Sequence, residues 1–187
     1  SIDSNTNADI SLKYSGDIYF AQGKFEKAFE SYRQSIEINP NLALYETVTY
    51  LSYGNLQARK ACIEMLPRIK NPAARQKLLV LLANMLHSEK QYERTDAFEA
   101  VHKLGISAAP ITKDIVSLLD DENPVIKKEA LDFISVAPAQ AVKFGALEKI
   151  KNILKHENEL IKISAIECLG NMKKYAAICL PELVNIT

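Results

Sequence analysis

The chain has 187 residues, of which 48% are hydrophobic and 25% are charged, and its 23 basic and 23 acidic side chains give a formal net charge of zero. This composition is typical of a globular protein and lacks the strong basic excess that a nucleic-acid backbone demands, so we expect a protein partner and no nucleic acid. No apolar run approaches the roughly 18 residues of a membrane-spanning helix, so we expect no membrane span.

The predicted elements are all helices. Glycine and proline are spaced along the chain rather than clustered, and the segments between them have the apolar periodicity of amphipathic helices. Strand signals are scarce, and the fold is therefore predicted to be all-α. After a polar tail over residues 1–8, expected to be disordered, helices are predicted at 9–21, 25–38, 42–53, 55–69, 73–88, 93–104, 108–120, 124–136, 141–155, 160–173 and 177–186.

The first two predicted helices carry a pattern of small, aromatic and turn-forming residues. Gly16 and Ala28 would let two helix backbones approach closely, and Pro40 would end the second helix. Over residues 9–40 the pattern resembles one tetratricopeptide (TPR) repeat, with matches at Gly16, Tyr19, Gly23, Ala28, Tyr32 and Pro40. The resemblance implies a helical hairpin, although Leu12, Ser15 and Ser35 depart from its usual residues.

The resemblance to a TPR repeat also implies ligand-facing positions, which fall on Ile10, Lys13, Asp17 and Phe20. Some members of the family clamp a C-terminal carboxylate. We do not expect this here, because Asp17 would repel a carboxylate and a single repeat cannot build the clamp. The hairpin is instead expected to pack against the following helices and to cap the N-terminal end of a repeat array.

A second pattern recurs with identical offsets at a spacing of 33–35 residues. Each copy has a leucine (Leu86, Leu119, Leu154), an apolar residue (Tyr92, Val125, Leu160), a basic residue (Arg94, Lys127, Lys162) and an alanine (Ala97, Ala130, Ala165). A looser fourth copy is placed at Tyr50, Leu56 and Ala61. The order of helix, polar loop and apolar-x-basic-x-x-Ala resembles the HEAT family in its short, bilin-lyase-type form, over about residues 55–187.

Together the two resemblances imply a right-handed α-α superhelix (α-solenoid). It would contain one TPR-like hairpin at 9–40 and three to four HEAT-like hairpins over 41–187. The expected units are 41–70, 73–105, 108–139 and 141–175, with a terminal helix at 177–187, and they would form one continuous solenoid.

The sequence carries no nucleotide-binding, zinc-protease or nucleophile-elbow motif. His87, His102 and His156 are too far apart for one metal site, and Cys62, Cys168 and Cys179 are expected to be packing residues. We therefore predict no enzymatic activity, no metal and no cofactor. The cysteine usage favours the cytoplasm, whereas a processed periplasmic or secreted protein would have the same N-terminal sequence.

The leading functional hypothesis is a scaffold that binds a protein partner on the concave face of the solenoid. Arg94, Lys127 and Lys162 would align as a column that reads acidic side chains of the partner, or they would serve only solubility and local pairing. The alternatives are a structural subunit that associates through the solenoid ends and a HEAT-type lyase or DNA-acting enzyme. Lys13, Asp17 and Phe20 complete the candidate binding residues.

Overall fold

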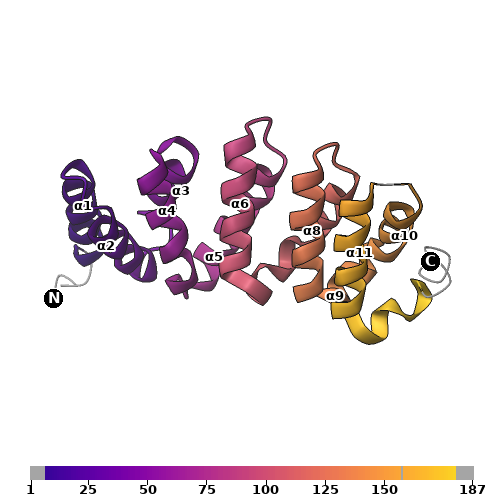
Figure 1. Ribbon diagram of the computed structural model, residues 1–187. Coiled ribbons are helices and arrows are strands. Elements are labelled where there is room, and N and C mark those ends of the chain that lie inside the picture. The colour runs from indigo at the N-terminus through magenta and orange to yellow at the C-terminus, as the bar shows by residue number, and fades with distance from the viewer. Residues whose placement is uncertain (1–6, 157, 180–187) are drawn as a thin grey trace. The chain divides into compact units, whose positions relative to one another are not determined.

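The computed structural model describes residues 7–156 and 158–179, and within these ranges the regular elements are helices and no strand occurs. The chain divides into two compact units, unit 1 (Ser1–Leu104) and unit 2 (Gly105–Thr187) (Figure 1). The boundary falls between two of the predicted repeats. Assembly of all repeats into one continuous array stays a prediction.

Unit 1 consists of three helical hairpins. The first pairs α1 (Ala8–Ala21) with α2 (Phe25–Ile38), the second pairs α3 (Leu44–Tyr53) with α4 (Leu56–Met65), and the third pairs α5 (Pro72–Leu86) with α6 (Gln91–Leu104). A 3₁₀ turn, Leu66–Arg68, extends α4. The α1–α2 turn depends on Gly23, whose φ of +70° lies in the left-handed region that favours glycine.

An aromatic cluster joins the first hairpin to the second. The Tyr32 ring is fully buried on α2 and lies against Gly16 of α1, where a Cβ would come within 2.3 Å of the ring. Tyr50 of α3 stacks on Phe20 of α1 with 3.7 Å between ring centroids, and Phe29 meets both rings edge-on. The first hairpin therefore packs against the following helices, as predicted.

Unit 2 contains two hairpins with irregular first halves. Its elements are a 3₁₀ segment (Gly105–Ile111), α7 (Thr112–Ser117), a 3₁₀ turn (Leu118–Asp120), α8 (Pro124–Val136), α9 (Pro138–Lys143), α10 (Ala146–His156), α11 (Glu159–Met172) and a final 3₁₀ segment (Lys173–Cys179). The helices α8 and α11 pack side by side, and α10 packs against α11 (Figure 1).

Several predicted helix boundaries were wrong. The helix expected at 108–120 is mostly 3₁₀, because Pro110 interrupts the α-helical hydrogen bonding. The helix expected at 141–155 is two helices, because Gly145 adopts a φ of +81° and turns the chain between α9 and α10. α1 begins at Ala8, within the expected tail, whereas residues 1–6 lie outside the described residues. Of the terminal helix expected at 177–187, residues 177–179 are 3₁₀ and the rest is outside the described part.

The internal repeat is visible in the buried positions. Each repeat buries its leucine in the first half of the hairpin and the same five positions in or directly after the second helix. In the last three copies the second-helix positions are occupied by Glu93, Ala97, Ala100, Val101 and Leu104, by Ile126, Ala130, Phe133, Ile134 and Ala137, and by Ile161, Ala165, Cys168, Leu169 and Met172. A repeated sequence pattern thus corresponds to a repeated core.

The fourth copy also exists, but its predicted register was wrong by one residue. Leu51, not Tyr50, takes the place of the buried leucine, and Cys62, not Ala61, takes the place of the buried alanine. The error arose because a cysteine replaces the usual alanine and Gln57 replaces the usual apolar residue. Cys62 is a free thiol whose burial raises its pKa, so it remains protonated and acts as a packing residue.

Asparagines begin three of the second helices. Asn55, Asn123 and Asn158 occupy the same repeat position, and each side-chain oxygen accepts a hydrogen bond from a backbone N–H in the first turn of α4, α8 or α11. Such a cap satisfies a donor that the helix leaves unpaired and stabilises a helix by about 1 kcal/mol. The helix starts, and hence the faces that α4, α8 and α11 expose, are fixed by these caps.

Candidate protein-binding surfaces

The described residues contain no cluster of three or more His, Cys, Asp or Glu side chains arranged to hold a metal. Within the same part of the chain, none of the helices combines the length and apolar character required to cross a bilayer. Cys168 is a second buried free thiol, and the side chain of Cys179 lies outside the described part. The candidate sites are therefore surfaces of the helical hairpins.

The ligand-facing positions implied by the TPR resemblance are engaged within unit 1. Lys13 Nζ lies 2.8 Å from Asp17 and 3.1 Å from Glu46 of α3, and these carboxylates raise the pKa of Lys13. Asp17 also accepts a hydrogen bond of 2.9 Å from the hydroxyl of Tyr32. A partner that bound Lys13 and Asp17 would have to displace contacts that hold the first hairpin to α3.

Phe20 is likewise committed to the aromatic cluster by its stacking on Tyr50. The exposed apolar residues of α1 lie elsewhere, at Ile10, Tyr14 and Ile18. Their spacing of four residues places them along one side of the helix, and Ile10 is the only one of them that the TPR resemblance had singled out. Partner binding by Lys13, Asp17 and Phe20 stays a prediction.

The basic positions form a row in the corrected register, with Arg59 of α4 preceding Arg94, Lys127 and Lys162. Arg59 Nε donates to Asp96 of α6 at 2.5 Å, and its guanidinium also donates to the Gly54 carbonyl at 2.9 Å. The ring of Tyr92 lies 4.9 Å from the guanidinium carbon. In this repeat the basic residue joins two second helices (α4 and α6) rather than facing solvent.

The other members of the basic row are also partly buried. Arg94 and Lys127 are half-buried and have interaction partners, and Lys162 Nζ lies 3.4 Å from Glu159. In each repeat the residue four positions after the basic one lies on the same side of the helix. These residues are Ile63, Phe98, Leu131 and Ile166, and the first three of them are buried. The basic residues therefore lie next to buried positions in the first three repeats. The structure thus brings Arg59 to Asp96, and partner contact by Arg94, Lys127 and Lys162 stays a prediction.

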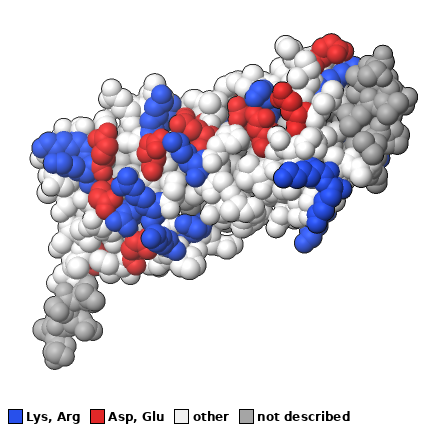
Figure 2. All heavy atoms as spheres, turned by 60° about the horizontal axis from the view of Figure 1, so that its bottom comes forward, with Lys and Arg blue, Asp and Glu red and all other residues white. Residues whose placement is uncertain are grey.

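The solvent-facing side of each second helix, here called the exposed stripe, carries a different set of repeat positions. Tyr92, Val125 and Leu160 have exposed fractions of 41%, 55% and 76%. Further along the same stripe, thirteen positions after each repeat's leucine, the residue is always acidic: Glu64, Glu99, Asp132 and Glu167. Glu64 pairs with Lys103 at 2.6 Å and Asp132 with Lys128 at 2.8 Å, and the face in Figure 2 shows cationic and anionic side chains interspersed.

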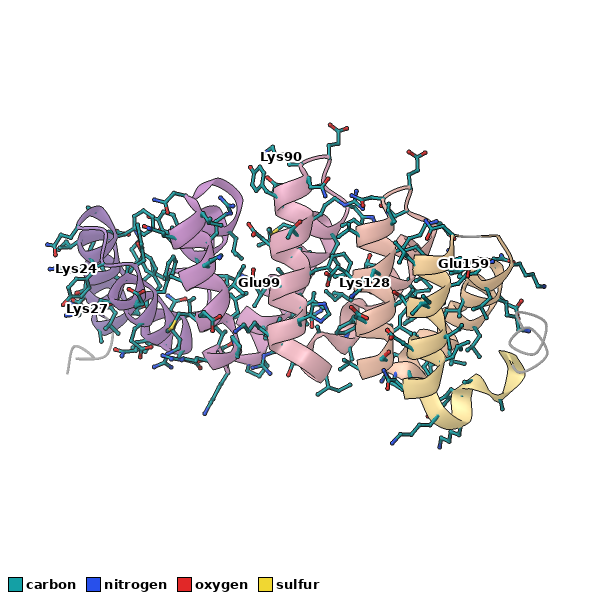
Figure 3. The ribbon with its side chains drawn as sticks, in the orientation of Figure 1. Lys24, Lys27, Lys90, Glu99, Lys128 and Glu159 are labelled. Carbon is teal, nitrogen blue, oxygen red and sulfur yellow. The ribbon has the colours of Figure 1, made fainter. Side chains whose placement is uncertain are left out.

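In unit 2 the exposed stripe is hollowed into a groove of about 460 Å³ between the first turns of α8 and α11. Val125, Leu160 and Ile163 supply its apolar surface, while Lys128 and Glu167 lie at its edge. Figure 3 labels Lys128 on α8 and Glu159 at the start of α11, on the two helices that bound the groove.

Comparison with known proteins agrees with this geometry. Residues 16–45, which cover most of the first hairpin and the start of α3, match the family model of the TPR repeat. Together with the structural likeness described next, this match confirms the predicted resemblance of the chain to TPR and HEAT-like helical repeats as a class of fold.

The fold resembles that of a designed armadillo repeat protein solved in complex with the peptide (KR)4. The TM-score is 0.53 at 23% identity, over 83% of this chain and 77% of that chain. This likeness confirms the predicted all-α solenoid fold class. A search of curated proteins found no match.

Sequence reasoning found the basic row but missed the acidic one. The acidic residues share an offset as regular as that of the basic residues, so the same comparison of copies would have found Glu99, Asp132 and Glu167, and placing Leu51 correctly adds Glu64. The pairing of Arg59 with Asp96 left a weaker signal, because the position of Asp96 is acidic in one other copy (Glu129) but is Ala61 or Ser164 in the remaining two. The groove depends on which side chains leave space unfilled, which only the packed structure reveals.

Proposed function

We propose that this protein is a non-catalytic scaffold that binds a protein partner through the exposed stripe of its second helices. TPR and armadillo-like repeats are in general protein-interaction folds, and the designed armadillo relative is bound to a peptide. A single exposed apolar side chain needs no explanation, but Tyr92, Val125 and Leu160 are exposed at the same position of three repeats. This recurrence is the observation that carries the proposal.

The stripe is also chemically suited to a peptide or protein surface. Apolar side chains near the helix starts supply area whose burial favours association, and the acidic row beyond them supplies charge that selects the partner. The basic row belongs to the proposal as a second contact zone, because Lys127 and Lys162 occupy equivalent positions on the neighbouring helices α8 and α11. Concave-face binding of the partner is part of the same proposal.

Two triple variants test the proposal against a partner captured from the source cell. One replaces Tyr92, Val125 and Leu160 with serine, and the other reverses Arg94, Lys127 and Lys162 to glutamate. Helicity should be unchanged in both. We expect the serine variant to weaken capture at least about ten-fold, since a few apolar anchors dominate most interfaces. Loss of capture only in the glutamate variant would assign binding to the basic row, and full capture by both would refute the proposal.

A second candidate function is a structural subunit that associates through an end of the helical array. The observation that favours it is the apolar stripe of Ile10, Tyr14 and Ile18 along α1, which gives the first hairpin an apolar outer face. An exposed apolar stripe of this kind on a repeat helix favours contact with another chain. Light scattering at rising protein concentration tests this candidate, and a Tyr14→Ser, Ile18→Ser variant should dissociate the assembly. A strict monomer at high concentration would exclude it.

A further inference from the structure

The groove of unit 2 has an apolar surface that is exposed to solvent. Val125 on α8, and Leu160 and Ile163 on α11, have exposed fractions of 55%, 76% and 51%, and all three line the groove. Because α8 and α11 pack directly against each other, these side chains form one continuous apolar strip rather than isolated surface residues. A strip of this kind fits a large aliphatic or aromatic side chain of a partner.

The equivalent place in unit 1 is filled by the protein itself. There Arg59 crosses from α4 to Asp96 of α6 at 2.5 Å, and the Tyr92 ring covers the guanidinium at 4.9 Å. Unit 2 has Lys127, Ser164 and Leu160 at these positions, and Leu160 and Ser164 line the groove. In the filled copy an aromatic ring and a cation share this position, and the carboxylate that holds the cation there, Asp96, is replaced by Ser164 in unit 2.

The charges at the groove edge also favour a cation. Lys128 is the cation that lines the groove, and its ammonium pairs with Asp132 at 2.8 Å. The hydrogen bond to Asp132 raises the pKa of Lys128, and the negative charges of Glu129 and Glu167 add to this shift. Of the nearby lysines, Lys127 is half-buried and Lys162 lies beside Glu159. A partner cation near Glu167 would balance this excess, whereas a partner carboxylate would be repelled.

From the strip and the surrounding charges, we infer that the α8–α11 groove binds a segment of a protein partner in which a large apolar side chain adjoins Lys or Arg. This inference rests on the proposed function and names the chemistry of the partner at one part of the exposed stripe. Leu160 and Ile163 would contact the apolar side chain, and Glu167 would pair with the adjacent cation.

Titration of the full chain with defined peptides tests the inference. The probe is the octapeptide Ser-Gly-Phe-Lys-Leu-Lys-Ser-Gly, compared with one peptide in which Glu replaces both Lys and another in which Ser replaces Phe and Leu. Methyl NMR spectra report where each peptide binds. We expect the first peptide to shift the methyl signals of Val125, Leu160 and Ile163 saturably, and each comparison peptide to bind at least about ten-fold more weakly.

Matched variants separate the groove from general surface stickiness. Leu160→Ser should weaken binding of the octapeptide that contains Phe, Leu and both Lys about ten-fold. Leu56→Ser, at a 54% exposed leucine in the first turn of α4, should leave its binding unchanged. Glu167→Lys should weaken the same peptide several-fold, whereas Glu26→Lys, at an exposed carboxylate of α2 outside the acidic row, should have no effect. Equal effects of the groove and control variants would overturn the inference.

The outcomes also distinguish this inference from the proposed function. If the peptides leave the groove methyl signals unmoved but the serine variant of the exposed stripe still loses its natural partner, the groove chemistry is overturned and the proposed function stands. If the peptide binds the groove and the natural partner is captured equally by both triple variants, the proposed function is overturned and the groove chemistry stands. Binding of the Glu-containing peptide as tightly as the Lys-containing one would refute the charge argument.

Discussion

Replacement of Gly16 by alanine tests the packing of the TPR hairpin directly. The added Cβ would lie 2.3 Å from Cε1, 2.5 Å from Cδ1 and 2.9 Å from Cζ of the Tyr32 ring, well inside contact distance. The ring cannot easily move away, because it is fully buried, its hydroxyl donates to Asp17 at 2.9 Å, and Phe29 and Tyr50 lie against it. Gly16→Ala must therefore shift a helix or break the Tyr32 hydrogen bond.

The expected size of the effect follows from two opposing contributions. Overpacking a well-ordered core costs up to about 3 kcal/mol, whereas alanine is a better helix former than glycine by about 1 kcal/mol. We therefore expect Gly16→Ala to lower the free energy of unfolding of unit 1 by about 2 kcal/mol. Urea denaturation followed by tyrosine fluorescence measures this change, since all tyrosines except Tyr175 lie in unit 1.

The matched control is Gly170→Ala in α11. Gly170 is also helical, but no atom outside its own helix lies within 4 Å of the Cβ that alanine would add. This substitution should stabilise unit 2 by about 0.5–1 kcal/mol, since alanine loses less backbone entropy on folding. If both alanine variants gained stability, the close approach of α1 to α2 and the resulting hairpin geometry would be refuted.

Three further substitutions test the core, an inter-helix ion pair and a titrating carboxylate. Ala130→Asp places an unpaired charge at a fully buried position of α8 and should cost about 3 kcal/mol; an unshifted melting temperature would contradict its core placement. Alanine at Arg59, at Asp96 and at both should give a coupling energy of about 1–3 kcal/mol in a double-mutant cycle, and additive losses would show that the pair is not formed. The hydrogen bond from Arg33 lowers the pKa of Glu30 from 4.5 to about 2, so this carboxylate stabilises the fold above pH 4.5 and ceases to do so as the pH falls toward 2. Because Glu30 is partly exposed, Glu30→Gln should cost only about 0.5 kcal/mol at pH 7 and nothing at pH 2, which pH-dependent thermal melts can check.

The sequence predicted those features that depend on local periodicity. The α1–α2 hairpin was placed within one residue because Gly23 and Pro40 bound its second helix and apolar residues recur at helical spacing between them. The buried leucines, alanines and asparagine-capped second helices of the later repeats follow from the same periodicity. Pro110 and Gly145 were visible in the sequence, but their effect was underestimated because the flanking residues fit a continuous helix.

Features that depend on contacts between helices could not be predicted from one sequence. The pairing of Lys13 with Glu46, and of Arg59 with Asp96, joins residues of different helices whose relative rotation the periodicity does not determine. The basic row illustrates the consequence. Its regular offset was read as an outward-facing column, yet the structure places Arg59 between two helices and leaves the rest of the row half-buried.

The two kinds of repeat position therefore follow different rules. A position that contacts the core keeps its character in every copy, as the leucine row from Leu51 to Leu154 does, because each hairpin must bury the same face. A position between two second helices follows no such rule. Asp96 forms an ion pair with Arg59 of the neighbouring helix, whereas the smaller Ser164 lines an unfilled groove beside Leu160. Tight packing fixes that part of the surface, and an unfilled space leaves apolar area for a partner to cover. The agreement between copies thus defines the exposed stripe, and the difference between Asp96 and Ser164 indicates which part of it has apolar area left for a partner.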